Sequence, residues 1–288
     1  MTLVHAHLAP ATAPDPFAWG PALAGAAAAI AYWWAAGRLR RRGDAWPLWR
    51  ASSFTAGSAG VAWVAVRSLP GAPFTAHMGE HLILGMAAPL LLVVARPLTL
   101  TLRVLSPGTA RRGLLALAHS RPAAWLVFPP LAALLDLGGL WLLYRTDLFA
   151  AVQHRPLWHA LMHTHVLAAG LLLTFSVCQL DPARRRWSLP LRGATLLAVG
   201  AAHAVLAKTL YAAPPPGTAF TSADLQTGAQ IMYYGGDMAE AALAAVLAAS
   251  WYRAVGRTRH RRQHTGSRHR CQDVVARRRG DPRGGRRC

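Results

Sequence analysis

Two pairs of histidines stand four residues apart in this sequence, each near the start of a long apolar segment. His77 and His81 open the stretch "HMGEHLILGMAAPLLLVV". His159 and His163 lie in "LWHALMHTHVLAAG". In an α-helix, residues four apart project from one face, about one turn or roughly 6 Å apart. Neutral imidazoles so arranged can chelate copper, zinc or iron. The spacing therefore predicts a metal site made of these four histidines.

Two carboxylates and an amine occupy later apolar segments. Asp237 and Glu240 are three apart and share a helix face, so either one is protonated or a cation lies between them. We expect Asp237 to act as a further metal ligand and Glu240 to balance charge. Lys208 is the only lysine of the chain. We expect it to pair with these carboxylates, the alternative being that it extends to the nearby membrane surface.

Three further polar residues are expected to support the ligands. Glu80 lies inside the first histidine pair, one position off the line that joins the two rings, so it is placed to orient one of them. His165 follows the second pair by two residues and faces another way, and His203 is a single histidine in its own segment. The thioethers of Met78 and Met162 point off the histidine faces.

The segments that carry these residues have the length of membrane spans. The chain has 288 residues, of which 53% are hydrophobic, and its apolar stretches of about 20 residues match the hydrocarbon core of a bilayer. Helices are expected, because open sheet edges cannot face lipid. The sequence thus predicts an all-α, polytopic membrane bundle with about seven spans, at residues 17–37, 46–68, 74–95, 122–143, 156–179, 189–212 and 229–252.

The distribution of arginine predicts the orientation of these spans. The first span, Phe17 to Gly37, has no basic region before it and is longer than a signal-peptide core, so we expect it to be retained. Arginines crowd the connections after the first, third and fifth spans, whereas "APPPGTAFTSADLQTG" has no basic residue. The N-terminus is therefore expected outside and the C-terminus in the cytoplasm, which places the histidines and carboxylates near the outer surface.

The C-terminal segment, residues 253–288, differs in composition from the predicted membrane domain, residues 1–252. It has 13 arginines against two aspartates in a chain of net charge +20. Such a segment cannot bury enough apolar surface to fold, so disorder and contact with anionic headgroups are expected. It has no aromatic platform, so no nucleic-acid partner is expected. Cys178, Cys271 and Cys288 form no CxxC pair and are expected to be chemically idle.

Three stretches, in this order, resemble the CtaG family of bacterial cytochrome c oxidase assembly factors. They are "HMGEHLILGMAAPLLLVVARPL", "LWHALMHTHVLAAGLLLTFSVCQLDP" and "ADLQTGAQIMYYGGDMAEAALAAVLAASWYR". The resemblance implies a multi-pass protein of a bacterial cytoplasmic membrane that is not an enzyme. It also implies work at the outer face in the maturation of heme-copper oxidases, with oxidase subunits or other assembly factors as partners and copper as the metal supplied.

The family's motifs fall on particular residues of this chain. Its two His-x-x-x-His pairs and its late Asp with a Gly-Met stretch fall on His77, His81, His159, His163, Asp224, Gly228 and Met232. The sequence departs from the family pattern in having Glu80 inside the first pair, a short link between Asp224 and the last span, and the Arg-rich tail.

Three functions are consistent with these residues. The leading hypothesis is an assembly factor that binds copper through the histidine pairs. A haem-binding electron carrier would use one histidine of each pair as an axial ligand and leave the other two spare. A proton-coupled transporter would use Lys208, Asp237 and Glu240 as a relay, but no inverted repeat is evident and the polar groups crowd towards one surface.

Overall fold

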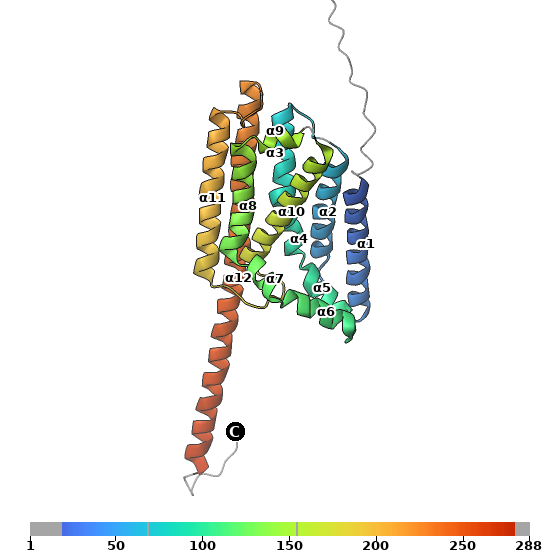
Figure 1. The fold of residues 1–288 in the computed structure, drawn as a ribbon. Coiled ribbons are helices and arrows are strands. Elements are labelled where there is room, and N and C mark those ends of the chain that lie inside the picture. Colours follow the sequence, from blue (N-terminus) through green and yellow to red (C-terminus); the bar gives the residue numbers. More distant parts are fainter. Residues whose placement is uncertain (1–18, 68, 154, 280–288) are drawn as a thin grey trace, which may run out of the picture. The chain divides into compact units, whose positions relative to one another are not determined.

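Helices make up the ordered framework of the protein. The structure is a computed structural model that describes residues 19–67, 69–153 and 155–279, with side chains up to residue 256. In chain order (Figure 1) the helices are α1 (Trp19–Arg41), α2 (Leu48–Val66), α3 (Pro73–Leu82), the π-helix η2 (Ile83–Ala87), α4 (Ala88–Val94), α5 (Pro97–Val104), α6 (Thr109–Ala118), α7 (Arg121–Leu126), α8 (Pro129–Arg145), α9 (Leu148–Gln153), α10 (Pro156–Cys178), α11 (Leu189–Ala212) and α12 (Ser222–Arg279). The described residues contain no strand, which confirms the all-α class.

The chain divides into two compact units, residues 1–244 and 245–288. The first holds α1 to α11 and the beginning of α12. In the second, α12 continues as a helix to Arg279. Cys288 and the side chain of Cys271 lie outside the described part, whereas Cys178 is a buried free thiol. The boundary at residue 252 and the disorder of the Arg-rich tail stay predictions.

In the part of the chain that the structure describes, three helical stretches are long and apolar enough to cross a membrane. They are Pro73–Val104, Pro156–Cys178 and Leu189–Ala212. Large apolar side chains also lie exposed on the helix surfaces, such as Trp34 at 63% and Leu197 at 77%. Lipid accommodates such side chains, whereas water disfavours large patches of them. The protein is therefore a membrane protein, and three of the predicted spans are confirmed as membrane-competent helices.

The predicted span 122–143 is wrong as a single helix. The chain instead forms α7, breaks at Val127 and Phe128, and begins again as α8 at Pro129. Phe128 is extended (φ −71°, ψ 119°), because the ring of a following proline disfavours the helical conformation. The two prolines thus stand at the start of a new helix, and α8 ends at Arg145. The last helix also begins earlier than residue 229, at Ser222.

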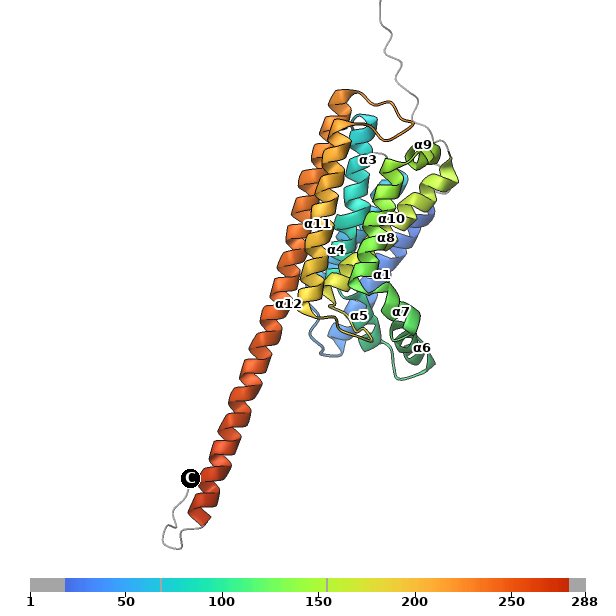
Figure 2. The same cartoon turned by 60° about the vertical axis from the view of Figure 1, so that its left-hand side comes forward.

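A buried core joins the helices that carry the polar residues. Phe74 and Met78 of α3 pack with Tyr144 of α8, Leu206 of α11 and Met232 of α12. Met78 is fully buried there, so its thioether is part of the core. In both views α3, α8, α10 and α11 lie together (Figures 1 and 2), and Figure 1 shows α1 and α2 at one side of them.

The helix that carries the first histidine pair is interrupted by the π turn η2. The N–H of Ala88 donates to the carbonyl of Ile83, five residues back. Pro89 follows and has no N–H to continue the α-helical ladder, which explains why the ladder changes here. Gly170 of α10 packs directly against the carbonyl of Gly85 in this turn. The π turn therefore sets how closely α10 approaches α3.

An aspartate from α12 caps the beginning of α3. The N–H groups of Phe74 and Thr75 donate to the carboxylate of Asp224 at 3.0 and 2.8 Å, and the Thr75 hydroxyl donates to it at 2.7 Å. These are N–H groups that a helix start leaves without an internal partner. Burial raises the pKa of Asp224, but these three donors outweigh burial and the pKa is lowered below its ordinary value. The carboxylate ties α12 to α3.

An aspartate caps the beginning of α5 in the same way. The N–H groups of Leu98 and Thr99 donate to Asp181 at 3.3 and 2.9 Å, and the Thr99 hydroxyl also donates to it. Here burial raises the pKa of Asp181, and the three donors only partly offset this. Both capped helices start with proline followed two residues later by threonine. The two aspartates therefore fix the beginnings of α3 and α5.

Candidate functional site

The first histidine pair projects from α3 into the core of the bundle. Nε2 of His77 lies 2.9 Å from the hydroxyl of Tyr144 in α8, a hydrogen bond whose direction depends on the imidazole tautomer. The ring of Phe149 in α9 packs 4.8 Å from the His77 ring, between centroids. His81, one turn further on, is only 5% exposed. His77 is thus held by neighbouring aromatic residues, and His81 is buried inside the bundle.

The second pair lies on α10, opposite the first. The rings of His159 and His163 are 4.2 Å apart between centroids, as expected for residues one turn apart on one face. Nε2 of His163 is 3.9 Å from a carboxylate oxygen of Glu80. Glu80 therefore faces the histidine pair of the other helix rather than its own. This contact links the two helices that carry the predicted histidine pairs.

His203 of α11 completes the cluster. Its ring is 2% exposed and lies 6.2 Å from the ring of His81, between centroids. Nδ1 of His203 is 3.6 Å from a carboxylate oxygen of Glu240 in α12. The ring rests against Gly236, where an added Cβ would collide with it. Four helices thus converge on one buried group of imidazoles and carboxylates.

Among the residues that the structure describes, several ring nitrogens of this cluster are buried and have no hydrogen-bond partner. They are Nδ1 and Nε2 of His81, Nε2 of His163 and Nε2 of His203. A buried polar atom without a partner costs about 1–3 kcal/mol, and folded proteins rarely leave several together.

We call His81, His163, His203, Glu80 and Glu240 the histidine cluster. Within the described residues, no three His, Cys, Asp or Glu side chains converge closely enough to hold a metal ion.

Three predicted residues lie away from the histidine cluster. Asp237 is exposed on α12, three residues before Glu240. Lys208 is exposed, with its ammonium 5.5 Å from the centroid of the Tyr233 ring. No ion pair joins it to Asp237 or Glu240 in the described part of the chain. His165 is exposed and packs over Gly139 of α8.

Sequence reasoning missed Tyr144 and underrated His203. Tyr144 ends an apolar segment, where an aromatic residue normally lies at the membrane surface, so nothing marked it as the partner of His77. His203 is a single histidine without a spaced companion. One signal was available, because Gly236 precedes Asp237 in a segment rich in alanine, and a small residue lets a ring from another helix approach.

Curated proteins similar to this chain come from mycobacteria. Uncharacterized protein Mb0105 of Mycobacterium bovis and uncharacterized protein MT0111 of Mycobacterium tuberculosis are each 36% identical to it over 190 residues, which are 63% of this chain and 29% of theirs. Uncharacterized protein ML1998 of Mycobacterium leprae is 34% identical over 177 residues, 58% of this chain and 27% of its own length. The chain thus spans less than a third of these relatives. No solved structure matches it.

The family comparison covers the helices that form the histidine cluster. The model of the cytochrome c oxidase caa3 assembly factor family (Caa3_CtaG) matches residues 30–254. That range includes α3, α10, α11 and the part of α12 that carries Glu240. The resemblance seen in the histidine stretches is confirmed, and the chain belongs to the family of cytochrome c oxidase caa3 assembly factors.

Proposed function

We propose that this protein assists the assembly of a caa3-type cytochrome c oxidase by holding copper at the histidine cluster. In this proposal it is a multi-pass protein of a bacterial cytoplasmic membrane with seven spans and its N-terminus outside. Its partners are oxidase subunits or other assembly factors, and it turns over no substrate. Membership of the family and the arginine-rich loops at one end of the helices support this role.

The observation that carries the proposal is the group of unpartnered imidazole nitrogens. Within the described residues, His81, His163 and His203 have four buried ring nitrogens without a hydrogen-bond partner. Neutral imidazole is a good ligand for copper, and a bound cation would satisfy such nitrogens. The chemistry of these donors therefore suits copper, and binding it would draw the rings closer together than they lie in the described residues. It differs from the set expected from the sequence, since His77 is bonded to Tyr144 and Asp237 is exposed.

The two carboxylates have a supporting role in this proposal. Glu80 lies 3.9 Å from His163, and Glu240 lies 3.6 Å from His203. A carboxylate beside a ligating histidine fixes the orientation and tautomer of the ring and raises its basicity. Two negative charges would also offset the charge of a copper ion in a region of low dielectric constant. Glu80 and Glu240 are therefore proposed to orient the ligands and balance their charge.

Metal analysis of the detergent-purified chain tests this proposal. We expect copper to bind the wild-type protein, and His81→Ala and His203→Ala each to weaken binding by at least about tenfold, since each removes a ligand. His165→Ala is the matched control, because His165 lies on α10 but is exposed and outside the histidine cluster. Its copper affinity should equal that of the wild type.

Two results would contradict the copper site. One is wild-type protein without copper together with unchanged affinity in His81→Ala and His203→Ala. The other is a Soret band in the absorption spectrum, which would assign the imidazoles to haem. Glu80→Gln tests the orienting role proposed for the carboxylates separately from metal ligation by the imidazoles. It should weaken copper binding by about tenfold and leave the ligands in place, because it removes an orienting charge and no imidazole.

A further inference from the structure

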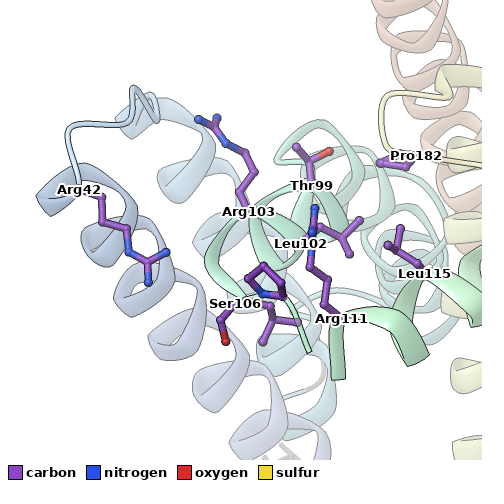
Figure 3. A pocket seen from close by; sticks show the side chains of 10 residues that line it. Arg42, Thr99, Leu102, Arg103, Ser106, Arg111, Leu115 and Pro182 are labelled. Carbon is purple, nitrogen blue, oxygen red and sulfur yellow. The ribbon is translucent and has the colours of Figure 1, made fainter. Parts of the chain in front are cut away.

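A second polar site lies at the end of the helices opposite the histidine cluster. It is a cavity of about 680 Å³ between the end of α1, the α5 helix, the beginning of α6 and the loop after α10 (Figure 3). The side chains around it are Arg42, Thr99, Leu102, Arg103, Leu105, Ser106, Pro107, Arg111, Leu115 and Pro182. We call it the arginine pocket. Its lining has three arginines and no acidic side chain.

Among the arginines that line the pocket, Arg42 and Arg103 have partners in the described residues, whereas Arg111 has none. Its Nε is buried and has no hydrogen-bond acceptor in the described part of the chain. Arg42 donates one N–H to the carbonyl of Val104 in a long hydrogen bond of 3.4 Å. In the view of Figure 3, Arg42 and Arg111 lie on either side of Ser106. Two guanidinium groups therefore border the pocket with most of their donors free to meet a ligand.

The acidic groups near the pocket are already engaged. Asp44 pairs with Arg103 at 2.9 Å, which neutralises the third arginine. Asp181 precedes Pro182, but its carboxylate accepts three hydrogen bonds from the beginning of α5 and is 2% exposed. Neither of these two carboxylates forms an ion pair with Arg42 or Arg111. The pocket is thus positively charged and lacks an anion of its own.

The rest of the lining is apolar, which restricts the class of anion. Leu102, Leu105 and Leu115 face the pocket together with two prolines. A ligand that fits both surfaces carries a compact anion beside an apolar portion, as a phospholipid does at the membrane boundary. The planar guanidinium donates two parallel N–H groups to a phosphate, a geometry that the lysine ammonium lacks.

We propose that the arginine pocket binds a phosphate group, with Arg111 as its main ligand and Arg42 as the second. The phosphate is that of an anionic phospholipid headgroup or free inorganic phosphate, which share this chemistry. The site lies at the opposite end of the bundle from the proposed copper ligands and is independent of them.

Lipid titration of the detergent-purified full chain tests the proposal, with binding followed by native mass spectrometry. Phosphatidylglycerol should bind more tightly than phosphatidylcholine. Arg111→Gln and Arg42→Gln should each weaken phosphatidylglycerol binding about tenfold, because each removes a charge-assisted hydrogen bond. Arg111→Lys should recover part of the loss, since it restores charge without the planar fork. Arg112→Gln, the neighbouring change outside the pocket, should stay within about twofold of the wild type.

Competition with inorganic phosphate identifies the source of the anion. Displacement of the lipid by millimolar phosphate supports the site and assigns it to free phosphate. Resistance to phosphate, with loss of lipid in Arg111→Gln, supports it and assigns it to the headgroup. If Arg111→Gln and Arg112→Gln weaken lipid binding equally, binding depends on general surface charge and the proposal is overturned. Equal affinity for the two lipids together with no displacement by phosphate would also overturn it.

Discussion

Replacing Asp224 by alanine should lower the midpoint of thermal unfolding in detergent by about 5–10 °C. The change removes the acceptor of two backbone N–H groups and of the Thr75 hydroxyl. Hydrogen bonds to a charged group contribute about 1.5–3 kcal/mol each, although they do not add fully, so a total near 3 kcal/mol is expected. Asp224→Asn keeps one carbonyl oxygen and should lose about half as much.

Acid should reproduce this loss in the wild-type protein. The pKa of Asp224 is lower in the folded protein than in the unfolded chain, because the hydrogen-bond donors outweigh burial. A depressed carboxylate pKa stabilises the folded state above the unfolded pKa of about 3.9, and this stability is lost as the pH falls through the folded pKa. The difference in unfolding midpoint between the wild type and Asp224→Asn should therefore be constant near neutral pH and shrink below about pH 4.

A matched pair of threonine variants tests the geometry of this cap. Thr75→Val removes the hydroxyl that donates to Asp224 and keeps the side-chain shape, so it should cost about 1 kcal/mol or more. Thr227→Val is the control, because that hydroxyl is exposed and bonds only to the Ala223 carbonyl of its own helix. If the two variants unfold at the same temperature, Asp224 does not stabilise α3 in the manner described.

Gly170→Ala should separate α10 from the π turn. An added Cβ at Gly170 would collide with the backbone carbonyl of Gly85, and a backbone atom cannot rotate away as a side chain can. Overpacking of this kind costs about 1–3 kcal/mol, and Gly170→Leu should cost more. Because α3 and α10 carry the facing members of the histidine cluster, copper affinity should fall with stability. Thermal unfolding and copper titration of the purified variants measure both effects.

Gly193→Ala provides the control for this change. Gly193 lies in α11 with no atom near the position of an added Cβ, so the variant should unfold at the same temperature or slightly higher. Alanine is favoured over glycine inside a helix by about 0.5–1 kcal/mol. Equal behaviour of Gly170→Ala and Gly193→Ala would show that α10 does not rest on the π turn. Intact copper binding in a destabilised Gly170→Ala protein would separate the packing from the site.

The helical segments and the two histidine pairs could be predicted from the sequence, because both depend on local patterns. Apolar length predicted α10 and α11 closely, and the four-residue spacing placed His159 beside His163. The prediction of one helix over 122–143 missed the break before Pro129. Two prolines in an apolar segment permit either a kink or a new helix, and the difference depends on what packs around them.

Partnerships between helices could not be predicted, because they depend on how the helices are rotated against one another. The assignment of Glu80 to His163 requires knowing which face of α3 meets α10. The same holds for Tyr144 with His77 and for His203 with His81. The π turn changes that rotation within a single apolar segment. A one-residue change in helix phase turns side chains by about 100°, which composition does not reveal.

The cap on α3 has a consequence for the order in which the protein is made. Asp224 lies 149 residues after Thr75 in the chain. While a ribosome synthesises the intervening helices, the first turn of α3 has two backbone donors and a hydroxyl without this acceptor. The beginning of the helix that carries His77 and His81 is therefore completed only when the last helix of the first unit arrives. A nascent chain that stops after α11 has the histidines but not the aspartate that holds their helix in place.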